Sequence, residues 1–556
     1  MKINIDESCD SFRRIREGGF YYVDKTMMLK EYLVDNFKSA VLFARPRRFG
    51  KTMTMTMFRD FLDNRQASRE IFEGLKIMEY PEVVQNYMNR WPVVFLSLKE
   101  VFGSGFDDFF RAFQTAVAAL CDEHADLLKS SRVSEVHKIF FRQLQKKDAG
   151  EEDTFHAPAF LCDMLYEHYG KPVFVIIDEY DVPMAKALGT PAYERVRDYI
   201  AHMLSYVCKT NEHVKAVLLS GCLYTVKNST YTGVNNIIPY TVLSPNYASC
   251  IGFTDLEVRK LLADADLSDR YDAVAEWYDG YLFGRDKMYC PWDVLRHVSS
   301  VMDGSYSEAL GPESYWVNTS ETSLDMIHGF LGKTAGVNES FEQLLAGNTI
   351  DCIVNDNLPY HQIFDSGDNL WSALLETGYL TKAVKERMQR MPLRIPNKGI
   401  QAVFRQEVWS YFKDRVENAF VTDFVNALWA ENTTAAEAAL NHILEATLSF
   451  YHEYREYSYH LILDGFFTGF GYRVLSEQES GYGRSDLIIQ DPARCRCMIL
   501  ELKHREEKSE MESSLREASG QIIDKKYDSH LRYEGYTIRL QYAMAFCGKT
   551  CRIAKL

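Results

Sequence analysis

The chain has 556 residues, of which 46% are hydrophobic and 25% are charged, and this composition predicts a globular protein with room for three or four domains. The net charge of −15 argues against a chain that coats nucleic acid indiscriminately, but it does not exclude one domain that binds nucleic acid locally. Cysteines are scattered along the chain, which is typical of a reduced protein. There is no apolar signal region, and no apolar run approaches ~18 residues. We therefore expect a cytoplasmic protein with no membrane partner.

The first 250 residues alternate between strand-like and helix-like segments, which predicts a parallel sheet covered on both faces. The strands are expected at 39–44, 91–99, 172–181 and 214–221. Helices are expected at 52–63, 103–126, 134–147 and 155–168.

The segment RPRRFGKT, residues 45–52, resembles a phosphate-binding loop in which Arg45 replaces the first glycine. In such a loop, backbone N–H groups and a helix N-terminus surround the phosphates, the lysine neutralises their charge, and the Ser/Thr hydroxyl binds Mg²⁺. These tasks fall to Gly50, Lys51 and Thr52, which are all present. Arg47, Arg48 and Phe49 complete the predicted nucleotide-binding loop. A chance GKT at the start of a surface helix remains the alternative if this segment is taken alone.

The segment VFVIIDE supplies the second half of a nucleotide site. Four or more apolar residues followed by Asp178 and Glu179 are typical of a Walker B strand, whose aspartate binds the metal and whose glutamate positions the attacking water. The order of P-loop strand, extra strand, Walker B strand and a further strand ending at Ser220 predicts an additional-strand ATPase. Ser220 is expected to be a sensor of the γ-phosphate, although it could simply cap its strand. Asn235 and Asn236 could be lid contacts or ordinary turn residues.

Further motifs occur in one order along the chain: YYVDKT (21–26), IIDEYD (176–181), YTGVNNI (231–237), GFTDLEV (252–258), WYDGYLFG (277–284) and YWVNTS (315–320). Together with RPRRFGKT, they resemble the bacterial AAA-ATPase-like family that carries a C-terminal PD-(D/E)XK nuclease domain. The loop of that family reads R-P-R-R-F-G-K-[ST], so the resemblance makes Arg45 a family trait. It implies ATP binding by Lys51 and Thr52, with Asp178 and Glu179 in their Walker B roles.

The organisation predicted from these patterns has three parts. Residues 1–250 form the P-loop ATPase domain, residues 251–440 form a helical lid and a winged-helix-like region, and residues 441–556 form the nuclease domain. In the middle part, residues 378–400 resemble a strand–turn–strand wing. The family tends to have Ile-Pro-Asn-x-Glu-Val there, whereas this chain has Lys398, Gly399 and Ile400 after the asparagine.

The C-terminal segment carries the residues of a second chemistry. Asp486 begins a strand after a glycine-rich hairpin, and Glu501 and Lys503 lie two residues apart on the next strand. Because residues i and i+2 of a strand point to the same face, the three can converge. Two carboxylates that hold Mg²⁺, beside a lysine, are what metal-assisted phosphodiester hydrolysis requires. Taken alone, the D…ExK pattern is short and could be a solvated strand edge.

The flanking helices agree with a nuclease core of order α-β-β-β-α-β. The segment beginning at Glu456 resembles the E-x-x-Y-H of the family, and the segment with Gln521 and Tyr527 resembles its following helix. The resemblance makes Glu456 an additional metal-binding or structural carboxylate and gives Gln521 a place at the catalytic site.

These observations predict an ATP-regulated, Mg²⁺-dependent nuclease that acts on DNA or RNA, with ATP as a switch and a role in defence or mobile-element control. The alternative is a signalling or scaffolding ATPase whose nuclease fold only binds a partner. The retention of Asp486, Glu501 and Lys503 speaks against the alternative. The oligomeric state is open, and a homo-oligomer is one of the states the sequence allows.

Overall fold

The computed structural model describes residues 3–224, 236–306, 311–315, 335–345, 347–356, 358–386, 388–413, 418–447, 456–480, 483–525 and 536–556. The chain divides into two compact units. The first contains Met1–Ser323 and Thr349–Gly399, and the second contains Leu324–Asn348 and Ile400–Leu556. The three domains and their boundaries at 250 and 440 remain predictions.

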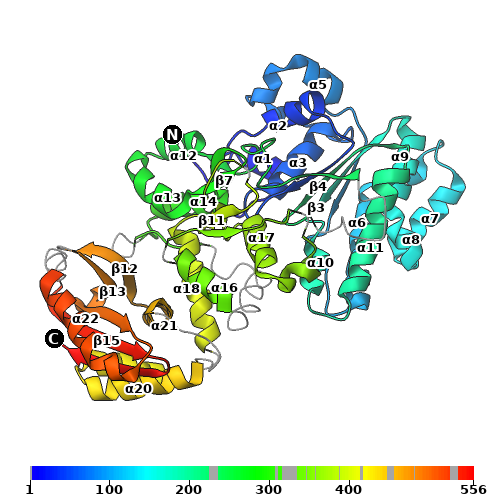
Figure 1. Cartoon of the computed structure of the whole chain (residues 1–556). Helices are drawn as coiled ribbons and strands as arrows, with labels where there is room; N and C mark the ends of the chain where they lie inside the picture. The colour runs from blue at the N-terminus through cyan, green and yellow to red at the C-terminus, as the bar shows by residue number, and fades with distance from the viewer. Residues whose placement is uncertain are drawn as a thin grey trace. The chain divides into compact units, whose positions relative to one another are not determined.

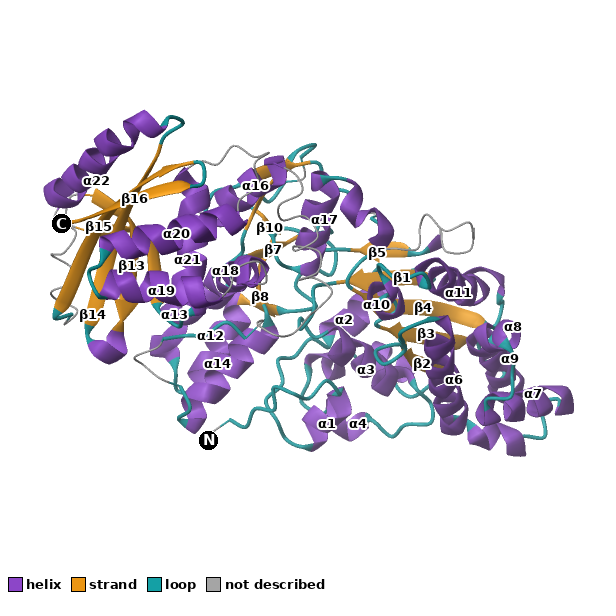
Figure 2. Ribbon diagram, turned by 90° about the horizontal axis from the view of Figure 1, so that it is seen from below, coloured by secondary structure: helices purple, strands orange, loops and turns teal. Residues whose placement is uncertain are grey.

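The first unit is built on a parallel sheet with the strand order β2-β3-β4-β1-β5, seen in Figure 2. Its strands are β1 (Ala40–Ala44), β2 (Val93–Ser97), β3 (Val173–Asp178), β4 (Val214–Gly221) and β5 (Ile238–Tyr240). Every residue of β1 and β3 is buried, as expected of apolar strands whose two faces are both covered by helices. The predicted parallel sheet is confirmed, and β4 lies between β1 and β3.

Helices connect and cover these strands (Figure 1). They are α1 (Phe12–Glu17), α2 (Met27–Lys30), α3 (Lys51–Leu62), α4 (Arg69–Phe72), α5 (Pro81–Tyr87), α6 (Phe106–Glu123), α7 (Glu135–Lys146), α8 (Glu151–Phe155), α9 (Ala157–Tyr169), α10 (Val182–Ala187) and α11 (Tyr193–Ser205). Several ends follow from local sequence. Ser134 caps α7 by accepting a hydrogen bond from the His137 N–H, and Gly170 ends α9 in the left-handed conformation.

A small antiparallel sheet of order β6-β8-β7 follows. Its elements and the adjoining helices are β6 (Phe253–Thr254), α12 (Asp255–Asp264), α13 (Tyr271–Tyr278), β7 (Tyr281–Phe283), β8 (Asp286–Tyr289) and α14 (Pro291–Asp303). Thr254 and Glu257 form a reciprocal capping box on α12. The β7–β8 hairpin was not expected in a region that reads as helical. Both strands are very short, and every residue of β7 is buried. Hydrophobic periodicity therefore cannot distinguish this hairpin from a helix.

The remainder of the first unit comprises β9 (Ile350–Cys352), α17 (Gly367–Thr377), β10 (Thr381–Lys382) and β11 (Met391–Arg394). The strands β10 and β11 are antiparallel, and β11 also pairs with β9. The strand–turn–strand arrangement predicted for residues 378–400 is therefore present in the structure.

The second unit contains a mixed sheet of order β12-β13-β14-β15-β16. Its elements are α16 (Ala335–Leu345), α18 (Lys398–Lys413), α19 (Asn418–Trp429), α20 (Thr433–Thr447), α21 (Glu456–Gly469), β12 (Arg473–Ser480), β13 (Gly483–Asp491), β14 (Arg496–His504), α22 (Met511–Lys525), β15 (Ile538–Cys547) and β16 (Thr550–Lys555). The strands β14 and β15 run parallel, and the other neighbours are antiparallel. The last strand, β16, was not predicted.

The two faces of this sheet have separate cores. Alternate residues such as Leu500 and Leu502 pack with α19, α20 and α21. The intervening residues pack with α22 in two smaller clusters. Leu440, at the predicted boundary between the middle and C-terminal domains, belongs to the first of these cores. Of the helices in the described residues, none combines the length and the apolar character needed to cross a bilayer.

Candidate nucleotide and nuclease sites

The loop between β1 and α3 turns sharply into the helix. Gly50, immediately before α3, has φ 94°, a left-handed conformation that favours glycine. Arg45 stands at the start of the loop and is completely buried. Its guanidinium donates hydrogen bonds to the carbonyl oxygens of Ala44, Tyr240 and Tyr247, each at 2.8 Å. The side-chain hydrogen bonds of Arg45 therefore fix the start of this loop, where the usual phosphate-binding loop has a turn at glycine.

Lys51 begins α3, and its side chain is buried at the end of the sheet. Its ammonium donates to the Pro46 carbonyl at 3.2 Å and lies 3.3 Å from Glu179 Oε1 and 3.6 Å from Cys222 Sγ. Burial disfavours the charge, but the Cys222 sulfur and the neighbouring carboxylates outweigh this effect and raise the pKa of Lys51. The lysine is therefore a fixed cation inside the loop.

Thr52, Asp178 and Ser220 form a second set of contacts beside Lys51. Thr52 Oγ1 donates to Asp178 Oδ2 at 2.9 Å, and Ser220 Oγ donates to Asp178 Oδ1. Ser220 Oγ also accepts a hydrogen bond from the Glu179 N–H at 3.1 Å. Burial and the charge of Glu179 raise the pKa of Asp178 to about 6, in spite of the two hydroxyl donors. Because β4 lies between β1 and β3, its last residues can contact both nucleotide motifs.

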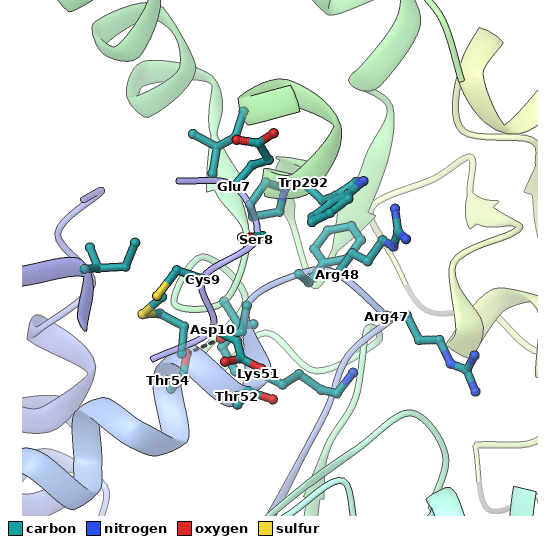
Figure 3. Close-up of a pocket in the computed structure, with 18 of the residues that line it drawn as sticks. Glu7, Ser8, Cys9, Asp10, Arg47, Arg48, Lys51, Thr52, Thr54 and Trp292 are labelled. Atoms are coloured by element: carbon teal, nitrogen blue, oxygen red, sulfur yellow. Dashed lines mark hydrogen bonds between the residues drawn. The ribbon is translucent and has the colours of Figure 1, made fainter. Parts of the chain in front are cut away.

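A cavity of about 600 Å³ opens over this loop (Figure 3). Its lining includes all the predicted loop residues from Arg47 to Thr52, together with Glu179. The other walls come from the N-terminal segment, the segment around Tyr22, the turn at 250–253 and the start of α14. A cavity of this size that is lined by both polar and apolar side chains is typical of a small-molecule site. Asp178 and Ser220 are fully buried beneath its wall.

The three loop arginines differ in their surroundings. Arg48 donates to the Tyr315 carbonyl at 2.9 Å, and its guanidinium lies 4.2 Å from the centre of the Trp292 ring. Phe49 packs edge-on against Tyr281 at 5.0 Å between ring centres. Arg47 lines the cavity, half-buried. Asn236 is exposed just before β5, and the neighbouring Asn235 lies outside the described residues.

Two residues that were not singled out from sequence also contact this site. Asp181 accepts hydrogen bonds from the backbone N–H groups of Cys222 and Leu223 at 2.8 and 3.0 Å, and from the Tyr360 hydroxyl at 3.1 Å. Asp181 therefore holds the chain just after β4 in place. The sequence could have indicated Asp181, because it is the last residue of the IIDEYD motif. Tyr360 lies far away in the sequence, and no local pattern indicates its contact.

The predicted nuclease residues lie on the mixed sheet of the second unit. Glu501 and Lys503 are both buried on β14, and the Lys503 ammonium lies 3.9 Å from Glu501 Oε1. It also donates to the Leu502 carbonyl at 2.9 Å. Their partners in register on β15 are Ala543 and Ala545, which pack with residues of α22. Since Leu500 and Leu502 pack towards α21, alternation turns Glu501 and Lys503 to the α22 face.

The other predicted nuclease residues are located by their backbone positions. Leu487 pairs with Leu500 across β13 and β14, so Asp486 and Glu501 are the next positions along the two strands. Glu456 is the first residue of α21. The side chains of Asp486 and Glu456, and the whole of Tyr527, lie outside the described residues. Gln521 is on α22, and within the described part of the chain its buried Oε1 atom has no hydrogen-bond partner.

The donor atoms fit magnesium at the first site, because Thr52 Oγ1 and Asp178 Oδ2 are hard oxygens held side by side. At the second site the buried Glu501 carboxylate has the same chemistry, and the strand register brings a second carboxylate position next to it. Side chains within the described residues form no cluster of three metal-ligating groups.

Comparison with known proteins identifies both regions. Residues 7–231 match the family described as a predicted AAA-ATPase, and residues 454–556 match the PD-(D/E)XK nuclease superfamily. The chain joins an AAA-ATPase-like domain to a C-terminal PD-(D/E)XK domain. The resemblance of the sequence motifs to this combination is thus confirmed, and the mixed α/β structure agrees with it.

One similar curated protein is the "Uncharacterized protein in vnfD 5'region" of Azotobacter chroococcum mcd 1. It is 26% identical over 399 residues, which cover 70% of this chain and 67% of the relative. No solved structure matches the chain significantly.

Proposed function

We propose that the protein is an ATP-regulated, Mg²⁺-dependent nuclease. The observation that carries the ATPase half is that Lys51, Thr52 and Glu179 line one cavity, with Asp178 hydrogen-bonded to Thr52 beneath its wall. In this proposal an additional-strand ATPase domain occupies residues 1–250, and a lid and a wing-like region follow it to residue 440. The nuclease core of order α-β-β-β-α-β occupies 441–556.

At the nucleotide site, each residue has a distinct task. Lys51 neutralises the phosphates, and Thr52 with Asp178 would hold Mg²⁺, which supplies further charge neutralisation. Glu179 orients the attacking water and accepts its proton. Ser220 fixes Asp178 through its hydroxyl and aligns the backbone of Glu179. It thereby acts as the sensor residue.

At the nuclease site, Asp486 and Glu501 would hold Mg²⁺, which polarises the phosphodiester and acidifies a water molecule. Lys503 orients the nucleophile and offsets the charge that develops on phosphorus. Glu456 is an additional carboxylate near the entry of α21. Gln521 on α22 is available to accept a hydrogen bond from the attacking water or from a donor group of the substrate, because its buried Oε1 atom has no hydrogen-bond partner among the described residues. The partner is nucleic acid, and a role in defence or mobile-element control fits this pairing of activities.

The second candidate function is a signalling or scaffolding ATPase whose C-terminal domain only binds a partner. A buried Glu501–Lys503 pair favours the nuclease, because burying two charges in a sheet carries a desolvation cost that a binding module has no need to bear.

The decisive experiment incubates the purified protein with single- and double-stranded DNA and RNA, with and without Mg²⁺ and ATP. Mg²⁺-dependent cleavage whose rate changes with ATP supports the proposal. Mg²⁺-dependent ATP hydrolysis without cleavage of any substrate supports the scaffolding alternative and overturns the nuclease.

A further inference from the structure

The geometry points to Arg47 as a catalytic arginine that acts on the γ-phosphate of ATP bound to the same chain. The inference rests on the proposed ATPase function and goes beyond simple nucleotide binding by this loop. It assigns to one residue of the loop a task that many ATPases leave to a neighbouring subunit.

The contacts of the three loop arginines single out Arg47. Arg45 is committed to three backbone carbonyls, and Arg48 to a carbonyl and the face of Trp292. Within the described part of the chain, the Arg47 guanidinium makes no hydrogen bond or ion pair, although the residue is half-buried and lines the cavity. Figure 3 shows Arg47 and Arg48 leaving the loop in different directions. A half-buried guanidinium at a cavity wall is poised to bind an anionic ligand.

The charged groups that act on Arg47 include two carboxylates of the Walker B segment. Burial opposes its charge, but Cys222, Tyr360 and the carboxylates of Asp181 and Glu179 act in the other direction, and the pKa of Arg47 is raised. Glu179, the proposed water-orienting residue, lines the same cavity as Arg47. Arg47 and Glu179 can therefore contact the same nucleotide when one is bound in this cavity.

The chemistry at this position requires positive charge in the transition state. A water oxygen forms a bond to the γ-phosphorus while the bond from phosphorus to the β–γ bridging oxygen breaks. The electron pair of that bond leaves with ADP, and the proton of the water passes to Glu179. Negative charge grows on the leaving oxygen, and a planar guanidinium donates hydrogen bonds to it and to the γ-phosphoryl oxygens. An arginine in this role, in cis or in trans, accelerates hydrolysis by roughly 10³–10⁵-fold.

Loss of a catalytic residue lowers kcat, whereas loss of a residue that only binds the ground state weakens the affinity for ATP. We expect Arg47→Ala to lower kcat for ATP hydrolysis at least 100-fold while the Kd for ATP changes less than threefold. Binding of ADP with aluminium fluoride, which imitates the transferring phosphoryl group, should weaken far more than binding of ATP. Arg47→Lys should recover little activity, because an ammonium cannot form the paired hydrogen bonds. Arg69→Ala, an exposed arginine on α4, is the matched control.

Mixing two inactive variants distinguishes action in cis from action in trans. If Arg47 acts within its own chain, a mixture of Arg47→Ala and Lys51→Ala remains inactive at every ratio. Recovery of hydrolysis in the mixture would show that Arg47 reaches a neighbouring chain and would overturn the inference. Unchanged kcat in Arg47→Ala, or a loss of ATP affinity as large as the loss of kcat, would overturn it as well. A parent protein that does not hydrolyse ATP would instead overturn the proposed function on which it rests.

Discussion

Lys51 and Lys503 each lie beside a glutamate, but the two pairs are assembled in different ways. Glu179 follows a different strand of the sheet from the one that leads to Lys51, and the two charged groups meet at 3.3 Å. Glu501 and Lys503 lie two residues apart on one strand, with 3.9 Å between their charged groups. The first pair depends on strand order in a sheet, whereas the second depends on the alternation of a single strand. Each pair should therefore respond only to changes in its own unit.

The largest effect is expected for variants of the nuclease site, which should lose cleavage but keep ATP hydrolysis. Asp486→Ala and Lys503→Ala should lower Mg²⁺-dependent cleavage by orders of magnitude, because the first removes a metal ligand and the second an essential charge. ATP hydrolysis should remain at the parental rate. Cleavage assays and ATPase assays on the same preparations measure both, with the exposed Lys508→Ala as the control. Parental cleavage by either variant would contradict the assignment.

Variants of the nucleotide site should do the opposite: they should lose ATP hydrolysis but keep the cleavage that occurs without ATP. Lys51→Ala should abolish ATP binding and hydrolysis without unfolding the protein, and it should leave cleavage at the rate seen without ATP. Glu179→Gln should keep ATP binding and lose about 10²–10⁴-fold in hydrolysis, since only the water-orienting carboxylate is removed. Equilibrium binding and single-turnover hydrolysis test this pair of variants. Lys146→Ala on α7, an exposed lysine, should behave as the parent, and equal turnover by Lys51→Ala and the parent would refute the site.

A third prediction concerns the independence of the nuclease sheet. The composition change near Tyr451 alone favours a separable unit at 451–556. The structure adds α19 and α20 to the same core through residues such as Phe424, Leu428 and Ile443. Each such side chain contributes roughly 1.5–3 kcal/mol when buried. We expect a fragment of residues 418–556 to unfold cooperatively and a fragment of residues 451–556 to lose that transition. Thermal unfolding followed by circular dichroism compares them, and equal cooperativity would show that the helices are dispensable.

A smaller effect is expected at the sensor position. Ser220→Ala removes a donor to Asp178 and the acceptor of the Glu179 N–H, and unsatisfied buried groups cost about 1–3 kcal/mol. We expect kcat for ATP hydrolysis to fall about tenfold, which corresponds to about 1.4 kcal/mol, while ATP-independent cleavage stays constant. The exposed Ser268→Ala is the control. A strand-capping role alone would lower thermal stability without this loss of kcat.

The smallest effect concerns Glu376 on α17, which is buried beside Arg45. Burial, reinforced by Asp356 and opposed by Arg45, raises its pKa to about 8. The folded state therefore retains a proton that the unfolded chain has released, and stability should fall as the pH rises from about 4.5 to 8. In Glu376→Gln this contribution disappears. The melting temperature of the variant should decrease less between pH 6 and pH 9 than that of the parent. Parallel curves would contradict the prediction.

Much of the molecule follows from local sequence. The apolar strands, the Gly50–Lys51–Thr52 helix start, the Asp178–Glu179 strand end and the Glu501–x–Lys503 alternation were all readable, because each depends on neighbouring residues. The strands β5, β6, β7, β8, β9 and β16 were missed, since they are short and their pairing partners decide their conformation.

Only the tertiary structure decided how distant segments meet. The position of β4 between β1 and β3 brings Ser220 and Cys222 to the phosphate loop, and the Tyr360 hydroxyl reaches Asp181 across 179 positions of sequence. No local pattern specifies such contacts, because they depend on strand order and on how chain segments pack. For the same reason, the sequence shows three arginines in one loop, and only the fold separates the buried Arg45 and the stacked Arg48 from Arg47.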